Sequence, residues 1–91
     1  MDEMSWRAQL AKSNINILNI TWNDDNTIAE VFYEFMYRPY NGQIKWCKTW
    51  TQVVGDVVGE SAMEHQMPVS GENIAKTLRS ETLALRKELE G

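Results

Sequence analysis

The sequence contains few of the residues that most often carry out catalysis or bind metals. Its 91 residues include one cysteine, Cys47, and one histidine, His65. No nucleophile elbow, oxyanion loop, glycine-rich phosphate loop or HExxH zinc helix surrounds either residue. Glu30 and Glu34 would lie about 13 Å apart along a strand, which is too far for a glycosidase carboxylate pair. The sequence therefore predicts a protein that is not an enzyme.

The chain also lacks the features of secreted and membrane proteins. A single cysteine cannot form an internal disulfide bond, on which small secreted domains usually depend. Its first ten residues have neither the positive nor the apolar region of a signal peptide. No apolar run approaches the roughly 18 residues that a membrane span needs. These absences predict a cytoplasmic protein without a membrane partner.

Basic residues are the minority among the charges. Nine Lys and Arg residues stand against 13 Asp and Glu residues, which gives a net charge of −4. General nucleic-acid binding requires the neutralisation of phosphates by basic residues, so this balance argues against it. Residues 38–50 hold bases only, whereas residues 51–75 hold acids only. Such segregation favours a specific protein partner over a polyanion.

The residues that are present predict one small domain that spans residues 1–91. Hydrophobic residues make up 43% of the chain and charged residues 24%, as in folded proteins. The predicted fold class is α+β. It consists of an antiparallel β-meander of three or four strands, a short N-terminal helix, and a C-terminal helix packed on one face.

The N-terminal half predicts a helix and then two strands. Residues 2–12 form the helix, with Trp6 and Leu10 on one side. Residues 15–22 are rich in β-branched side chains, and residues 27–37 alternate in polarity, so each segment is expected to be a strand. A cluster of Asn and Asp residues between them predicts a turn. One face of the second strand carries Ala29, Val31, Tyr33, Phe35 and Tyr37.

The middle of the chain predicts a second hairpin. Asn41-Gly42 is a strong signal for a tight turn, and residues 43–50 are expected to form the third strand. Residues 51–67 leave two interpretations open. The valines between positions 53 and 58 favour a strand, whereas their helical spacing also makes a continuous apolar stripe. The strand is slightly favoured because two glycines would weaken the helix.

The last helix is expected over residues 71–89, with Ser70 as its N-cap. Its outer face supplies the first candidate binding site. Leu83 projects about 180° from Ile74, opposite the stripe expected to be buried. A leucine ringed by bases can anchor an acidic protein partner, although single exposed leucines are common on surfaces without any function. The expected buried stripe is Ile74, Ala75, Leu78, Thr82, Leu85 and Leu89, and the candidate partner-binding residues are Lys76, Arg79, Leu83, Arg86 and Lys87.

The third strand supplies the second candidate site. Its sequence interleaves lysines with tryptophans, a pattern typical of sheets that stack single-stranded nucleic-acid bases. The favoured interpretation, however, is that Trp46 and Trp50 form the core beneath the last helix. Exposure of either ring would favour the functional interpretation. The candidate nucleic-acid-binding residues are Lys45, Trp46, Lys48 and Trp50.

No metal or cofactor is predicted. Met63, His65 and Met67 would make a thin Cu(I) site, and the turn at residues 23–26 lacks the ligand spacing of a calcium loop. The leading hypothesis is a non-enzymatic protein-binding module, an inhibitor or adaptor that acts on a larger protein or nucleoprotein complex. Small acidic phage-encoded inhibitors of host defence share this size and charge. The alternative is single-stranded nucleic-acid binding through the third strand.

Overall fold

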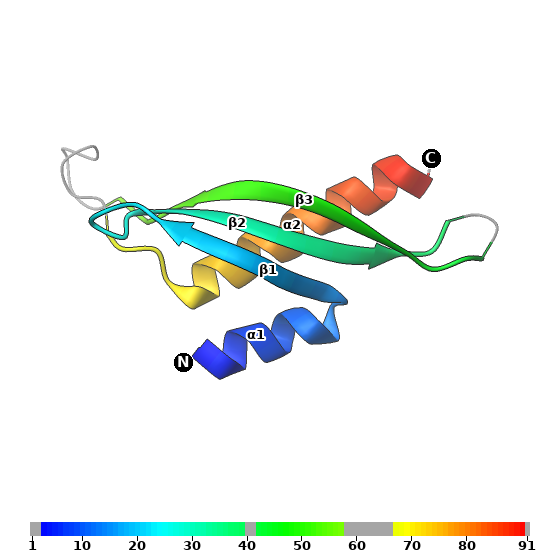
Figure 1. Cartoon of the computed structure of the whole chain (residues 1–91), viewed down its shortest axis with the longest axis horizontal. Coiled ribbons are helices and arrows are strands. Elements are labelled where there is room, and N and C mark those ends of the chain that lie inside the picture. Colours follow the sequence, from blue (N-terminus) through cyan, green and yellow to red (C-terminus); the bar gives the residue numbers. More distant parts are fainter. Residues whose placement is uncertain (1–2, 40–41, 58–66, 91) are drawn as a thin grey trace.

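The structure, a computed structural model, describes residues 3–39, 42–57 and 67–90. Its elements are α1 (Glu3–Lys12), β1 (Ile15–Trp22), β2 (Ile28–Tyr37), β3 (Lys45–Val54) and α2 (Gly71–Glu90). The strands form one antiparallel sheet in the order β1-β2-β3, and α2 runs diagonally across it (Figure 1). The predicted α+β fold is therefore confirmed, with three strands in the meander among the described residues.

Helix α1 packs through the two large apolar residues that its spacing predicted. Trp6 and Leu10 are both buried. The helix ends at Lys12, and two residues later Asn14 has a positive φ of 60° and donates its N–H to the Ala11 carbonyl (3.0 Å), as is typical of a left-handed C-cap. The Asn14 carbonyl in turn accepts a hydrogen bond from the Met36 N–H at 3.0 Å. The end of α1 is thereby fixed to the end of β2.

Both helices cover the same face of the sheet. The residues of β2 that alternate inward are buried, and they share one core with the buried residues of the two helices. Glu30 and Phe32, which alternate with them, are exposed. We refer to the face under the helices as the covered face and to the opposite one as the open face. On β2, the buried residues are Ala29, Val31, Tyr33 and Phe35, as the period of two predicted.

The pairing of β2 with β3 decides which side of β3 is covered. Tyr33 lies opposite Thr49, so Thr49 is on the covered face and Trp50 is on the open face. The favoured interpretation of the two tryptophans as core residues is therefore wrong. A two-residue Asn41-Gly42 loop would have paired Tyr33 with Trp50. The observed connection spans residues 38–44, and a register shift of one residue turns every side chain of the strand over.

The strand interpretation holds for the described start of the ambiguous segment. Strand β3 continues to Val54, so the helical alternative is wrong for residues 51–54. Beyond the strand, the Gly55 N–H donates to the Thr27 carbonyl at 2.8 Å, and the Met67 N–H donates to the Asp56 carbonyl at 2.6 Å. Residues 58–66, the rest of the ambiguous segment before Met67, lie outside the described residues.

Helix α2 begins where its cap predicted. The Ser70 hydroxyl accepts a hydrogen bond from the Asn73 N–H at 3.1 Å. Most of the expected stripe lies inward, with Leu85 half-buried, but Leu89 is 46% exposed and the prediction for it is wrong. The reason is visible in Figure 1, where the C-terminal end of α2 extends past β3 and has no strand above it. The fully buried residues of the stripe are Ile74, Ala75, Leu78 and Thr82.

Within the described ranges, neither helix has both the length and the apolar composition needed to cross a membrane.

Candidate functional site

The open face has an ordered arrangement of side chains across β2 and β3. Apolar cross-strand pairs alternate with polar ones along the two strands. Directly opposed residues on one face of a sheet lie close enough for their side chains to interact. The apolar pairs are Ile28–Val54, Phe32–Trp50 and Met36–Trp46, and the polar pairs between them are Glu30–Gln52 and Glu34–Lys48.

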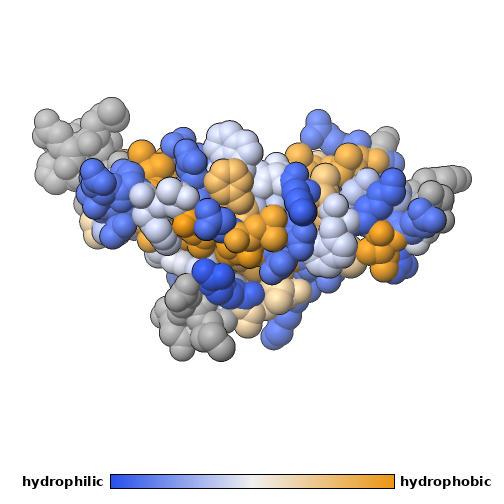
Figure 2. Space-filling view, viewed as in Figure 1, coloured by the Kyte–Doolittle hydropathy of each residue, from blue (hydrophilic) through white to orange (hydrophobic). Residues whose placement is uncertain are grey.

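Large aromatic residues are exposed on this face. Trp50 is 58% exposed, Trp46 51% and Phe32 39%. The Phe32 and Trp50 rings lie 6.4 Å apart between centroids, with their planes tilted by 32°. Figure 2 shows hydrophobic residues that reach the surface in the middle of the molecule, between hydrophilic ones. Exposed aromatic residues that gather on one face of a protein are typical of interaction sites.

The charges on the open face are mainly negative. Glu30 and Glu34 of β2 lie on it, whereas β3 contributes Lys48 alone. The Glu34 carboxylate accepts a hydrogen bond from the Asn16 side-chain amide at 3.1 Å. Lys45 lies opposite Tyr37, on the side of the covered face. The structure thus brings Trp46, Lys48 and Trp50 together and separates Lys45 from them.

The outer face of α2 carries part of the predicted partner-binding set. Leu83 is 57% exposed, and Lys76 and Lys87 are exposed as well. Arg79 is also exposed but lies toward α1, where its guanidinium donates a hydrogen bond to the Gln9 side-chain carbonyl at 3.1 Å. This patch therefore consists of one leucine between two lysines, with an arginine at its border.

Arg86 is not on the outer face, so its predicted position is wrong. Its guanidinium donates hydrogen bonds to the carbonyls of Met36 and Ser13, each at 2.9 Å. It also lies over the Phe35 ring, 5.6 Å from the centroid. Because Arg86 follows the buried Thr82 by four residues, it projects toward the same side of the helix. Arg86 joins α2, the end of α1 and the end of β2.

Sequence reasoning missed a hydrogen-bonded cluster centred on Glu81. The Glu81 carboxylate accepts a bond from the Tyr33 hydroxyl at 2.9 Å and another from the Thr51 hydroxyl at 2.6 Å. Burial, followed by the bond to Glu81 and its charge, raises the pKa of Tyr33 above its ordinary value. The sequence did contain a signal, since Glu81 follows Ile74 by seven residues and so shares its buried face.

A groove lies on the covered side between α2 and the edge strand β3. Its volume is about 320 Å³. A second hollow shares Thr49 and Leu85 with this groove and is also lined by Glu81. The walls of the first groove are largely apolar, and Lys48 and Glu88 also line it. We call this feature the edge groove; the apolar part is lined by Phe35, Cys47, Thr49, Leu85 and Leu89.

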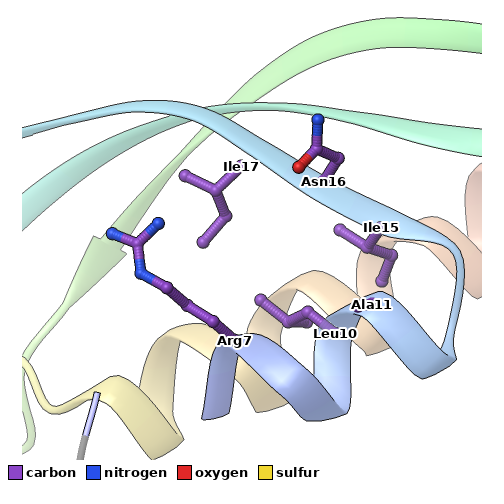
Figure 3. Close-up of a pocket in the computed structure, with 6 residues that line it drawn as sticks. All are labelled: Arg7, Leu10, Ala11, Ile15, Asn16 and Ile17. Atoms are coloured by element: carbon purple, nitrogen blue, oxygen red, sulfur yellow. The ribbon is translucent and has the colours of Figure 1, made fainter. Parts of the chain in front are cut away.

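A smaller cavity of about 120 Å³ lies between α1 and β1. Figure 3 shows Arg7 reaching toward it from the helix, with Ile17 projecting from the strand. Cofactor sites usually enclose about 300–1,000 Å³, so this space is too small for one. Arg7 also lies over the Trp6 ring, 5.0 Å from its centroid. We therefore interpret this cavity as a packing gap between α1 and β1.

The sequence also raised Met63 and His65 as candidate metal ligands. Both Met63 and His65 lie outside the described residues. Comparisons of the chain with protein-family models, with curated proteins and with solved structures gave no match.

Proposed function

We propose that this chain is a non-enzymatic protein-binding module that docks its partner on the open face of the sheet. The exposure of Trp46 and Trp50 beside Phe32 is the observation that carries the proposal. A domain of this size buries only about 60–65% of its unfolded surface. Leaving two tryptophans and a phenylalanine partly in water forgoes stability, which a partner that covers them would restore.

The composition of the open face fits a protein interface. Tryptophan, phenylalanine and methionine are enriched at the centres of interfaces, and a few such residues supply most of the binding energy. The Phe32–Trp50 pair is the centre of the face, since apolar pairs stand on either side of it along the strands. The polar pairs between them supply hydrogen-bonding groups. A module of this kind acts as an inhibitor or an adaptor on a larger protein or nucleoprotein complex.

The outer face of α2 is the weaker candidate for the same function. It offers Leu83 as its one large apolar side chain, with Lys76 and Lys87 beside it. A single exposed leucine is common on protein surfaces. The open face carries three large aromatic residues and is therefore the primary docking surface in our proposal.

Single-stranded nucleic-acid binding is the second candidate function. The exposed faces of Trp46 and Trp50 favour it, since base stacking requires an open ring. The charge of the face opposes it, because Glu30 and Glu34 stand where phosphates would need cations. We therefore expect no saturable change in tryptophan fluorescence when oligonucleotides are added at low salt. Saturable, salt-dependent quenching would reverse this ranking.

Partner capture with matched variants tests the proposal. Tagged wild-type protein, Trp50→Lys and Leu83→Asp are each used to capture partners from the native host, and circular dichroism verifies that all three are folded. Trp50 and Leu83 are almost equally exposed, at 58% and 57%, so each variant adds a charge to a comparable surface position. We expect Trp50→Lys to lose the captured partner and Leu83→Asp to retain it. The opposite pattern would transfer the site to α2.

A further inference from the structure

The two carboxylates on the open face have different neighbours. Glu34 lies directly opposite Lys48, whose positive charge compensates it in part. Glu30 lies between Gln52 on β3 and Thr21 on β1, neither of which carries a charge. Glu30 is also exposed, so a partner can reach it. Its cross-strand neighbours therefore leave the negative charge of Glu30 uncompensated.

The Phe32–Trp50 pair lies next to Glu30 on the same face. Phe32 follows Glu30 by two residues along β2, which separates them by about 7 Å. Trp50 is the diagonal neighbour of Glu30 on β3, at about 7–8 Å, a distance that long side chains span. Both rings are exposed. One side chain of a partner can therefore contact a ring and the Glu30 carboxylate together.

Lys48 restricts where a positive group can bind on this face. Along β3, Lys48 precedes Trp50 by two residues and Gln52 follows it by two, so they flank the ring on opposite sides. A cation on the Lys48 side would meet a like charge, which is unfavourable. A cation on the Gln52 side meets the carboxylate of Glu30 instead. We call this position the Glu30 corner; it is formed by Glu30, Phe32, Trp50 and Gln52.

The charges at the two ends of the sheet favour the same position. Asp24 and Asp25 lie in the turn between β1 and β2, at one end of the sheet (Figure 1). Arg38 and Lys45 lie at the other end, where β2 connects to β3. Glu30 is near the start of β2 and so lies toward the acidic end. A positively charged group that approaches the open face is therefore attracted toward the Glu30 corner.

We propose that the partner on the open face inserts an arginine into the Glu30 corner. Its guanidinium lies over the Trp50 ring and donates hydrogen bonds to the Glu30 carboxylate. Arginine suits this corner better than lysine, because a planar guanidinium stacks on an aromatic ring and matches the geometry of a carboxylate, whereas an ammonium is compact and strongly hydrated. The inference rests on the proposed function, since it names the chemistry of the partner that the open face binds.

Calorimetric titration with penta-arginine at low salt tests the corner without the natural partner. The peptide should bind saturably. Penta-lysine carries the same charge and should bind at least about threefold more weakly, because it gains less from the ring. Absence of saturable penta-arginine binding would overturn the proposal, and so would equal affinities for the two peptides.

Charge reversal at matched positions locates the bound peptide. Glu30→Lys and Glu90→Lys change the net charge equally at exposed positions, the first in the corner and the second at the end of α2. Glu30→Lys should raise the Kd for penta-arginine by about tenfold or more, and Glu90→Lys by less than about twofold. Circular dichroism verifies folding, and Glu30→Gln replaces Glu30→Lys if the reversal unfolds the domain. Equal effects at the two positions would overturn the proposal.

Removal of a ring tests the stacking contact. Trp50→Ala should raise the Kd for penta-arginine by about threefold or more. Trp22→Ala is the matched control, because Trp22 is 42% exposed but lies on β1, opposite the buried Ala29. It should leave the Kd unchanged. A Trp50→Ala variant that binds penta-arginine as the wild type does would exclude stacking on this ring.

The captured partner separates this inference from the proposed function. We expect both Trp50→Ala and Glu30→Lys to weaken its binding, each by about tenfold or more. If Trp50→Ala weakens binding and Glu30→Lys does not, the open face still binds the partner but the arginine contact is wrong. If neither variant weakens binding, docking on the open face is itself wrong.

Discussion

Phe32 on β2 and Trp50 on β3 are direct cross-strand neighbours on the open face, with ring centroids 6.4 Å apart and planes tilted by 32°. Aromatic pairs in such tilted arrangements gain about 0.5–1.5 kcal/mol beyond the area they bury. Both side chains are nevertheless exposed, whereas Tyr33, next to Phe32 in the chain, is fully buried. The sheet thus has aromatic residues on both faces, and one of those faces is available to a partner.

The exposure of the tryptophans predicts small effects on stability when they are removed. Trp46→Ala and Trp50→Ala should each lower the free energy of unfolding by about 1–2 kcal/mol, since each ring is partly solvated and only Trp50 loses an aromatic pair. Phe35→Ala, on the covered face, should cost about 3–5 kcal/mol. Denaturant titration measures all three. Losses of equal size would mean that the tryptophans belong to the core.

The faces of the strands could be predicted from the sequence, but not which face of β3 the helices cover. The alternation of Trp46, Lys48 and Trp50 placed them correctly on one side of the strand. Tryptophan is the more hydrophobic choice for a core than Cys47 or Thr49, so composition favoured the wrong face. Only the register with β2 decides the matter, and it depends on the length of the connection at residues 38–44.

The turn in that connection gives a prediction of its own. Gly42 has a φ of +83°, a region that β-branched residues rarely adopt, and its N–H donates to the Pro39 carbonyl at 2.9 Å. Gly42→Val should lower the free energy of unfolding by about 1 kcal/mol or more. Gly42→Asn is the control, because asparagine tolerates a positive φ, and it should lose less. Equal thermal stability of the two variants would count against a strained position.

Glu81 is expected to stabilise the covered face through its two hydrogen bonds. Glu81→Ala would leave the buried Tyr33 hydroxyl and the Thr51 hydroxyl without this acceptor. The loss should be about 1–3 kcal/mol, the cost of leaving a buried polar group unsatisfied. Glu88→Ala, which removes an exposed carboxylate from the same helix, should change stability by less than about 0.5 kcal/mol. Chemical denaturation at neutral pH distinguishes the two.

The raised pKa of Tyr33 predicts a dependence of stability on alkaline pH. The folded state holds the proton on the hydroxyl more strongly than the unfolded state, whose tyrosines titrate near the ordinary value of 10.0. The stabilisation is therefore complete below pH about 10 and is lost as the pH rises above it. Tyr33→Phe should flatten this decline in thermal unfolding measured from pH 8 to 11. An unchanged slope would show that Tyr33 is not its source.

The candidate site on α2 could be predicted in part. Helical projection placed Leu83, Lys76 and Lys87 on the outer face, as observed. Arg86 lies on the flank of the helix, four residues after the buried Thr82, and its long side chain reaches the carbonyls of Met36 and Ser13 from there. Projection gives the direction of a residue from the helix axis, whereas hydrogen bonds to distant backbone groups depend on the tertiary structure.

The affinity of the captured partner for Trp50→Ala, measured by calorimetry, tests the central claim most directly. The open face should lose its hot spot while the domain stays folded, so Kd should rise by about tenfold or more. Circular dichroism and thermal unfolding of the same sample verify that the fold is intact. Wild-type affinity in a folded protein that carries Phe32→Ala, Trp46→Ala and Trp50→Ala together would contradict the claim that this face binds the partner.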